Sequence, residues 1–599
     1  MKKLIVVATL LAAVSASALQ AAPVSREKAL SIAAKVFAGG PVTKAAGGNL
    51  SIIWEGEEPA TKAPLEVNPP FYVINRDGGG FVIVAGFDHL RPVLGFSFDN
   101  SFEKDNMPAN VKWLMDQIKA YCLSTGIPTR EIVQLWAELE DTKAPLNDAF
   151  ITGEFKNNHT VNWNQNGPAN ALTPVYGGQH SVCGCLPLAM AEILVWNGYP
   201  ERGTGYLPSY QNNGSTVGGY DLDTEYMWEE LRELDTYSEF LNCTDPVRTN
   251  LAQFVLDCGV MLQASYSPSG TGAYSEDVVK AYGTYMGYNK AANLEEMSNY
   301  SRSVWDAMLL DEVTQRPLLY CGFDPNPYTG GGHAYVLDGY ATFMDSELVF
   351  HYNLGWGGSG NGYYYSSYQD TFTEGLQALF NFTPDPEGTS EYSLSLAVEN
   401  YDSSNLGGLT VTDGPLSPGS SFSASLSYYY IMGSDNFDGY VFLVLEDKNG
   451  NEKCRFTLAD YTGSPMDHRY YAGSSGSFTV PSDVELELGD QLVAYYSPDG
   501  TSLCTFRHPH DGSVPTEYPA FPVTFIHKNA HYSVGDYFTF QLDNCPYRYQ
   551  DATWEITSPS GSVSTYAESD QEVRLTSSGR YKVVARTSQD TVITYINVN

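Results

Sequence analysis

The sequence predicts an α+β protein followed by an all-β C-terminal part. Residues 160–385 carry helical patterns first and strand patterns afterwards, which is typical of α+β domains. After about residue 386, short segments of alternating polar and apolar residues recur between turns, and no helical pattern is recognisable. A chain of 599 residues is also too long for a single hydrophobic core. We therefore expect several domains, with the all-β part built as sandwich-like modules.

A smaller α+β unit is predicted ahead of residue 160. Ser25 is a suitable N-cap for a first helix that ends at Gly39. Two apolar runs, residues 71–74 and 81–84, flank a turn-rich segment and predict a β-hairpin, and residues 111–122 form a further amphipathic helix. The predicted boundaries are 1–22 for an export signal, 23–145 for this small unit, 146–160 for an accessible linker, 161–385 for the larger α+β domain, and 386–510 and 511–599 for two β modules.

The first residues predict export from the cell. Lys2 and Lys3 precede an apolar run over residues 4–14, and the small residues of Ala16-Ser17-Ala18 suit a signal peptidase; Ala21-Ala22 is a second option. The apolar run is too short for a permanent membrane anchor, and no later run reaches that length. We expect a soluble, exported protein with no membrane span.

Composition excludes several classes of function. Lys and Arg total 33 against 70 Asp and Glu, and the net charge of −37 argues against binding to nucleic acid or anionic lipid. The nine cysteines are widely and irregularly spaced, which does not fit a dense disulfide framework, and their odd number leaves at least one thiol free. Neither a CxxC pair nor an HExxH motif occurs. We therefore expect no metal and no cofactor.

Cys185 is the first candidate for chemistry. It follows Gly184 and begins an apolar helical pattern, with Pro187 in the first turn where a missing amide proton is tolerated. A thiol at a helix N-terminus has its thiolate stabilised by the helix dipole and by free amides, and the thiolate is the nucleophile of covalent catalysis. Cys183 lies in the preceding loop without that support. A buried structural cysteine explains the segment equally well.

Two later segments supply partners for a thiol. His333 opens an apolar strand directly after three glycines, which let another segment approach the imidazole closely. Asn353 and Trp356 lie in a glycine-rich turn after the next strand. Asn353 could fix the imidazole tautomer, and Trp356 could shield that contact from water. Each feature also has a structural interpretation when it is considered alone. His333 is then a structural histidine, and the glycine-rich turn is a hairpin with a tryptophan in the core.

The order of these segments resembles the papain-like peptidases, and their details resemble the streptopain family. Three segments of the larger domain carry the resemblance: GQHxxxGC ending at Cys185, GGHAYVLDGY with His333, and HYNLGWGGSGNGYY with Asn353 and Trp356. Two further matching features lie upstream of Cys185, namely Gln165 and the segment FVIVAGFDHLRPVLGFS. The resemblance covers roughly residues 23–385. The family usually has tryptophan where Leu354 stands, so both Asn353 and Trp356 stay candidates for the orienting residue.

The resemblance implies a papain-like catalytic domain preceded by an inhibitory propeptide. It implies Cys185 as nucleophile, His333 as general base, and Gln165 with the Cys185 amide as oxyanion donors. It also implies a bacterial endopeptidase that is secreted or held at the cell surface or in the periplasm, with protein substrates and its own propeptide as inhibitor. We expect a monomer.

The loop of residues 267–272 is expected to border the substrate cleft, and activation is expected to need a cut between residues 141 and 160. A different class of function stays open at this point. A catalytically weak or inactive protease fold could serve as a binding or adhesion protein whose β modules bind a surface ligand. Leu354 and Pro187, which depart from the family pattern, are what favours this alternative.

Overall fold

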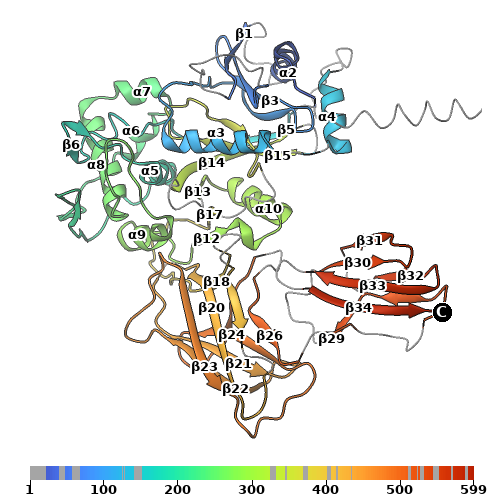
Figure 1. Ribbon diagram of the computed structural model, residues 1–599. Helices are drawn as coiled ribbons and strands as arrows, with labels where there is room; N and C mark the ends of the chain where they lie inside the picture. Colours follow the sequence, from blue (N-terminus) through green and yellow to red (C-terminus); the bar gives the residue numbers. More distant parts are fainter. Residues whose placement is uncertain are drawn as a thin grey trace, which may run out of the picture. The chain divides into compact units, whose positions relative to one another are not determined.

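The computed structural model divides into two compact units (Figure 1). Unit 1 holds Met1–Asn289 and Arg302–Thr389, and unit 2 holds Lys290–Ser301 and Ser390–Asn599. The structure describes residues 22–39, 48–56, 68–124, 126, 128–140, 151–158, 160–323, 332–343, 347–368, 375–400, 406–412, 416–433, 435–509, 514–521, 524–525, 532–543, 552–567, 571–586 and 591–599. The predicted export signal lies outside these residues, except for Ala22. The α+β class is confirmed for unit 1 and the all-β class for the C-terminal part.

The small α+β unit forms as predicted. Its first helix begins after Ser25, whose hydroxyl accepts a hydrogen bond from the Lys28 amide at 3.2 Å, and Gly39 caps its end. The expected hairpin is present, with Phe71 opposite Ala85. The elements of this unit are α2 (Arg26–Ala38), β1 (Leu50–Trp54), β2 (Phe71–Arg76), β3 (Phe81–Ala85), β4 (Val93–Ser97), α3 (Ala109–Cys122) and α4 (Arg130–Glu140).

The sheet of the small unit continues into the sheet of the larger domain. In unit 1 the strand order runs β1-β2-β3-β4-β16-β15-β14-β13-β17. The junction is β4 with β16, where Gly95 pairs with Tyr364. A Cβ on Gly95 would lie 2.7 Å from the Tyr364 ring, so only glycine permits this approach. The strands of the larger domain in this sheet are β13 (Leu318–Phe323), β14 (Gly332–Phe343), β15 (Glu347–Asn353), β16 (Gly362–Tyr364) and β17 (Leu376–Phe380).

Part of the predicted linker is a strand of the same sheet. β5 (Ile151–Lys156) pairs antiparallel with β14. The Lys156 ammonium lies 3.7 Å from the Asp338 carboxylate, and the Tyr363 hydroxyl donates to Glu154 at 2.7 Å. The polar, glycine-containing sequence of this segment concealed its strand character. Residues 141–150 lie outside the described residues.

The helices of the larger domain pack beside this sheet. The helix predicted from Cys185 begins at that residue. Helix α6 ends at Arg232, and Thr236 and Glu239 then form a capping box that starts a separate helix, α7. The remaining elements are α5 (Cys185–Asn197), α6 (Trp228–Arg232), α7 (Tyr237–Asn242), α8 (Asp245–Met261), α9 (Val278–Tyr285), α10 (Arg302–Val313) and the short strands β6 (Val175–Tyr176), β7 (Gln179–His180), β8 (Tyr206–Leu207), β9 (Tyr210–Asn212), β10 (Ser215–Val217) and β11 (Tyr220–Asp221).

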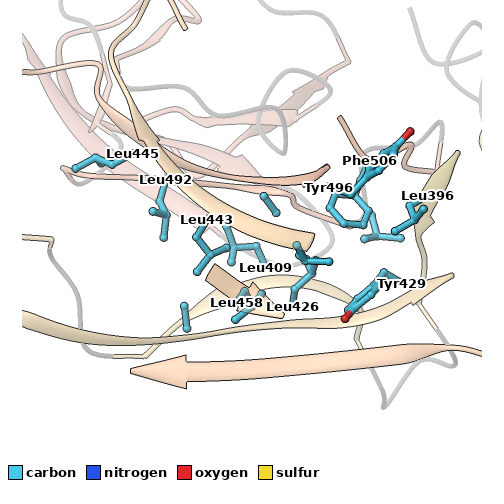
Figure 2. Packing of buried hydrophobic residues seen from close by; sticks show 14 of the residues in the cluster. Leu396, Leu409, Leu426, Tyr429, Leu443, Leu445, Leu458, Leu492, Tyr496 and Phe506 are labelled. Atoms are coloured by element: carbon cyan, nitrogen blue, oxygen red, sulfur yellow. The ribbon is translucent and has the colours of Figure 1, made fainter. Parts of the chain in front are cut away.

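The first β module is a two-sheet sandwich within unit 2. One sheet has the order β18-β20-β19 with β23 on β20, and the other has β22-β21-β24-β25 with β26 on β24. Figure 2 shows the apolar side chains between them, including Leu426, Leu443 and Tyr496. The strands are β18 (Leu396–Val398), β19 (Gly408–Val411), β20 (Ser421–Ile431), β21 (Tyr440–Glu446), β22 (Glu452–Asp460), β23 (Ala472–Thr479), β24 (Gln491–Ser497), β25 (Cys504–Thr505) and β26 (Glu517–Pro519).

The extent of this module differs from the predicted 386–510. Val514 and Ala520 belong to its core, so it continues past residue 510. The segment Lys290–Ser301, with β12 (Asn293–Glu296), also belongs to unit 2. Within that segment Glu295 forms an ion pair with Arg507 at 2.8 Å. These contacts join residues far apart in the sequence, which a local pattern does not reveal.

The second β module has its own core around Phe540, Trp554 and Val583. Its main sheet runs β31-β30-β33-β34. The strands are β27 (Thr524–Phe525), β28 (Tyr537–Thr539), β29 (Leu542–Asp543), β30 (Thr553–Thr557), β31 (Val563–Tyr566), β32 (Glu572–Arg574), β33 (Gly579–Arg586) and β34 (Thr591–Val598). In the part of the chain that the structure describes, no helix is both long and apolar enough to cross a membrane.

Candidate active site

Cys185 stands at the N-terminus of α5, where the sequence placed it. Gly184 caps this helix with a φ of +93°, a conformation that favours glycine. A Cβ on Gly184 would lie 3.0 Å from the carbonyl oxygen of Thr271. The Thr271 hydroxyl in turn donates to the carbonyl of Val182 at 2.6 Å. The loop of residues 267–272 therefore lies directly against the segment that carries Cys185.

The two neighbouring cysteines have different surroundings. Cys183 is fully buried, and burial raises the pKa of its thiol well above the ordinary value. Burial also raises the pKa of the Cys185 thiol, although the backbone amides of Ala334, Leu186 and Cys185 itself act in the opposite direction. The helix N-terminus thus favours the thiolate as expected, but burial outweighs it in this form of the chain.

His333 lies on the strand beside Cys185. It is the second residue of β14 and pairs with Gly322 of β13. Helix α5 packs against β14, and the backbone amide of the next residue, Ala334, acts to lower the pKa of the Cys185 thiol. The chain thereby brings the strand of the predicted base to the predicted nucleophile. Of the three glycines before His333, only Gly332 is among the described residues.

Gln165 is fixed to the loop that carries the two cysteines. Its carbonyl accepts the Cys183 amide at 3.0 Å, and its side chain is 8 % exposed. The side-chain amide donates to the Asn110 side chain at 3.4 Å. Asn110 belongs to α3 of the small unit, so the predicted oxyanion donor contacts the predicted propeptide.

Helix α3 covers these residues. The Asn110 side chain donates to the carbonyl of Leu354 at 2.8 Å, and the Asn110 carbonyl accepts the Tyr335 hydroxyl. One turn further on, the Trp113 ring centre lies 5.6 Å from that of His333. A Cβ on Gly322 would lie 2.3 Å from the Trp113 ring, so the indole is packed on the strand beside His333. Neither Asn110 nor Trp113 is recognisable as functional in the sequence, because both fit an ordinary amphipathic helix.

The side chain of Asn353 is fully used by other partners. Its amide nitrogen donates to the Val161 carbonyl at 2.7 Å and to Glu192 at 3.1 Å. Its oxygen accepts the Gly355 amide at 3.2 Å and the Asn361 side chain at 2.9 Å. Two donor hydrogens and two lone pairs are the capacity of an asparagine amide. In this arrangement Asn353 therefore fixes the turn and α5, through Glu192, and has no remaining group for His333.

The second candidate, Trp356, is 8 % exposed and forms a β-bridge with Asn164, the residue before Gln165. Its ring contacts Phe102 of the small unit edge-on, with the ring centres 6.3 Å apart. Leu354, which replaces the usual tryptophan of the family turn, is fully buried. The turn is thus packed on both Gln165's segment and the small unit.

Replacing Asn353 with alanine is expected to lower the free energy of unfolding by about 2–4 kcal/mol, because several buried groups would lose their partner at once. Denaturant unfolding measures this loss. Asn166→Ala is the matched control, since Asn166 is exposed and should change stability little. A fully stable Asn353→Ala protein with impaired catalysis would instead favour the orienting role.

Buried ionisable groups lie behind the site. Burial raises the pKa of Glu192 well above its usual range, while the Trp163 amide and Asn353 act to lower it. Burial also disfavours the charged form of Asp338. The charges of His351 and Lys156 nevertheless lower the pKa of this carboxyl to about 2. These groups are not recognisable in the sequence, because single acids in apolar segments give no local signal. Among the described residues, no group of three His, Cys, Asp or Glu side chains is arranged to hold a metal ion.

Both the small α+β unit and the larger domain of unit 1 are similar to known proteins. Residues 163–364 match the Peptidase C10 family, and residues 21–122 match the Spi protease inhibitor family. Streptopain of Streptococcus pyogenes is 28 % identical over 314 residues, covering 49 % of this chain and 73 % of that protein. The thiol protease/hemagglutinin PrtT of Porphyromonas gingivalis is 28 % identical over 356 residues, covering 58 % and 39 % respectively. A solved fragment of Prevotella intermedia prointerpain A is 24 % identical, with a TM-score of 0.42, and covers 57 % of this chain and all of that fragment.

The α+β domain with a thiol at a helix N-terminus, together with the two family matches, defines a papain-like cysteine peptidase that is preceded by a propeptide domain. Residues 163–364 form a domain of the streptopain family, Peptidase C10. The resemblance stated from the sequence is thereby confirmed.

Proposed function

We propose that this chain is a secreted endopeptidase made as a zymogen, with Cys185 as nucleophile, His333 as general base and Gln165 as oxyanion donor. The observation that carries the proposal is the packing of α5 against β14, because the first of these elements begins at Cys185 and the second carries His333. Gln165 is joined to the loop before Cys185 through the Cys183 amide. This arrangement supports a common site for the three groups.

The proposed reaction is hydrolysis of a peptide bond in two stages. The Cys185 thiolate attacks the carbonyl carbon, a C–S bond forms, and the oxyanion accepts hydrogen bonds from the Gln165 side chain and the Cys185 amide. The protonated His333 gives its proton to the leaving amine as the C–N bond breaks. Water then attacks the thioester while His333 takes its proton, and the C–S bond breaks to release the acid and the thiolate.

The zymogen part of the proposal rests on helix α3. Asn110 contacts Gln165, and Trp113 packs against His333 and Gly322, so the helix touches both a proposed oxyanion donor and the proposed base. These contacts support a propeptide that inhibits by occupying the catalytic residues. The raised pKa of the half-buried Cys185 thiol agrees with a nucleophile held inactive while α3 is in place.

We place the activating cut between residues 141 and 150, a narrower interval than the sequence alone gave. β5 is paired with β14 and held by the ion pair of Lys156 with Asp338. A protease binds its substrate as a separate extended segment, so β5 would have to leave the sheet before it could be cut. The mature enzyme therefore begins ahead of Ile151 and keeps β5.

Trp113→Ala is expected to speed the release of the propeptide by about tenfold or more, since a tryptophan packed into an interface commonly contributes over 2 kcal/mol. The purified full-length chain is incubated with a reducing agent, casein cleavage is followed over time, and mass spectrometry determines the new N-terminus. Lys112→Ala is the control, because Lys112 is exposed on the same helix and pairs only with Asp116 there. Release at the wild-type rate, or a mature chain that begins after Lys156, would contradict the scheme.

Export is proposed from the N-terminal sequence. Lys2, Lys3 and the apolar run of residues 4–14 support a signal peptide, and the mature chain is then released outside the cytoplasm, at the cell surface or in the periplasm of a bacterium. Sequencing the N-terminus of the exported precursor tests this directly.

A further inference from the structure

A carboxylate that the proposed mechanism does not use lies near Cys185. Thr271 contacts Gly184, and the chain then continues from this loop into a 3₁₀ turn, Ser275–Asp277, which leads into α9. Glu276 is the middle residue of that turn. The segment that borders the nucleophile therefore carries an acidic side chain a few residues further on.

The neighbouring strands approach the same place from the other side. Cys321 of β13 pairs with Ala334 on one side and with Gln377 of β17 on the other. Burial raises the pKa of the Cys321 thiol well above the ordinary value, and the charges of Cys185 and Glu276 raise it further. Cys321 is thus within electrostatic range of both the proposed nucleophile and Glu276.

Glu276 is held by neutral groups. The Gln377 side-chain amide donates to its carboxylate at 3.5 Å, and the Ser275 hydroxyl oxygen lies 3.4 Å from the same carboxylate. The Ser275 hydroxyl donates its hydrogen to the Gln377 oxygen at 2.7 Å, which fixes the orientation of that amide. Gln377 is buried, whereas Glu276 keeps part of its surface exposed. Among the described residues, none supplies a cation in ion-pair contact with Glu276.

We infer that Glu276, oriented by Gln377 and Ser275, is a specificity-determining residue that binds a lysine or arginine side chain of the peptide substrate beside Cys185. The inference rests on the proposed function of that site. A carboxylate that is partly removed from water and lacks a cationic neighbour is stabilised by a cation that arrives with the substrate. A neutral side chain of the same shape leaves it unpaired. The site therefore discriminates by charge.

Arginine and citrulline peptides test this, because the two side chains have nearly the same shape and differ in charge. One series of peptides carries a single arginine, placed in turn at each position on either side of the cleaved bond, and the second series carries citrulline at the same positions. The kcat/KM of each peptide is measured with enzyme that has matured from the full-length chain. We expect the wild type to prefer arginine over citrulline at one position. Glu276→Gln should reduce that preference by about tenfold or more, with the rate on citrulline peptides little changed.

Two controls separate specificity from structure. Glu230→Gln removes the same charge from an exposed position on α6 and should keep the wild-type preference. Because burial already disfavours the charged form of Glu276 and raises its pKa, Glu276→Gln should not lower the melting temperature. If it does, Glu276→Asp, which keeps the charge, should retain the preference for arginine.

The outcomes are distinguishable. A wild type that cleaves both series without any preference, or a Glu276→Gln enzyme with the wild-type preference, overturns the inference and leaves the proposed peptidase site intact. A wild type that cleaves no peptide of either series, even after maturation in reducing agent, overturns the proposed function itself.

Discussion

Replacing Cys185 with alanine is expected to lower the rate of casein cleavage by at least about 10⁴-fold, because no other group of the site can form the covalent thioester. The sulfur lies at the start of α5, where the backbone amides of Ala334 and Leu186 act to lower the pKa of the thiol. The alanine variant should keep its fold, since it removes a single atom from a partly exposed position. Casein cleavage by wild-type and variant chains that an added protease has matured gives the rate, and circular dichroism shows that the fold is kept.

Cys183→Ala is the matched control. Cys183 is fully buried, and burial raises the pKa of its thiol well above the usual range, so it holds little thiolate at neutral pH. Its removal should cost some stability and leave most of the activity. Labelling by the thiol reagent E-64 should follow the same pattern, with loss only in Cys185→Ala. If Cys183→Ala is the inactive variant, the nucleophile has been misassigned.

The local features of the site were predictable because they have local causes. A glycine followed by an unbroken apolar helical pattern predicts the start of α5 at Cys185, and Pro187 in its first turn does not displace that start. Likewise, the apolar residues after His333 predict a strand, and β14 runs from Gly332 to Phe343. The assignment of roles came from resemblance, because spacing alone does not distinguish a catalytic histidine from a structural one.

What could not be predicted depends on contacts between distant residues. The pairing of β4 with β16, and of β5 with β14, joins segments that are separated by whole helices in the sequence. The engagement of all four hydrogen-bonding positions of Asn353 is of the same kind, since its partners come from three different parts of the chain. Burial of Cys185 is a further example. The sequence indicates the helix dipole that favours its thiolate, but the desolvation that opposes it arises only from the assembled fold.

Gln165→Ala is expected to lower kcat by about 10²–10³-fold, because an oxyanion donor acts in the transition state and hardly in the bound substrate. KM should change much less. The backbone of Gln165 still accepts the Cys183 amide in this variant, so the loop keeps its main anchor. Steady-state kinetics on the matured enzyme measures both constants, and Asn166→Ala, one residue further on and exposed, is the control.

The same substitution distinguishes a catalytic from a structural role, because Gln165 also contacts the propeptide through Asn110. Without that contact the propeptide is held less tightly, so a propeptide cut by an added protease should dissociate sooner while the chemistry becomes slower. A residue that merely stabilised the fold would lower the melting temperature and leave kcat per folded molecule unchanged. An unchanged kcat at wild-type stability would exclude Gln165 as the oxyanion donor and leave that role to the backbone amide of Cys185.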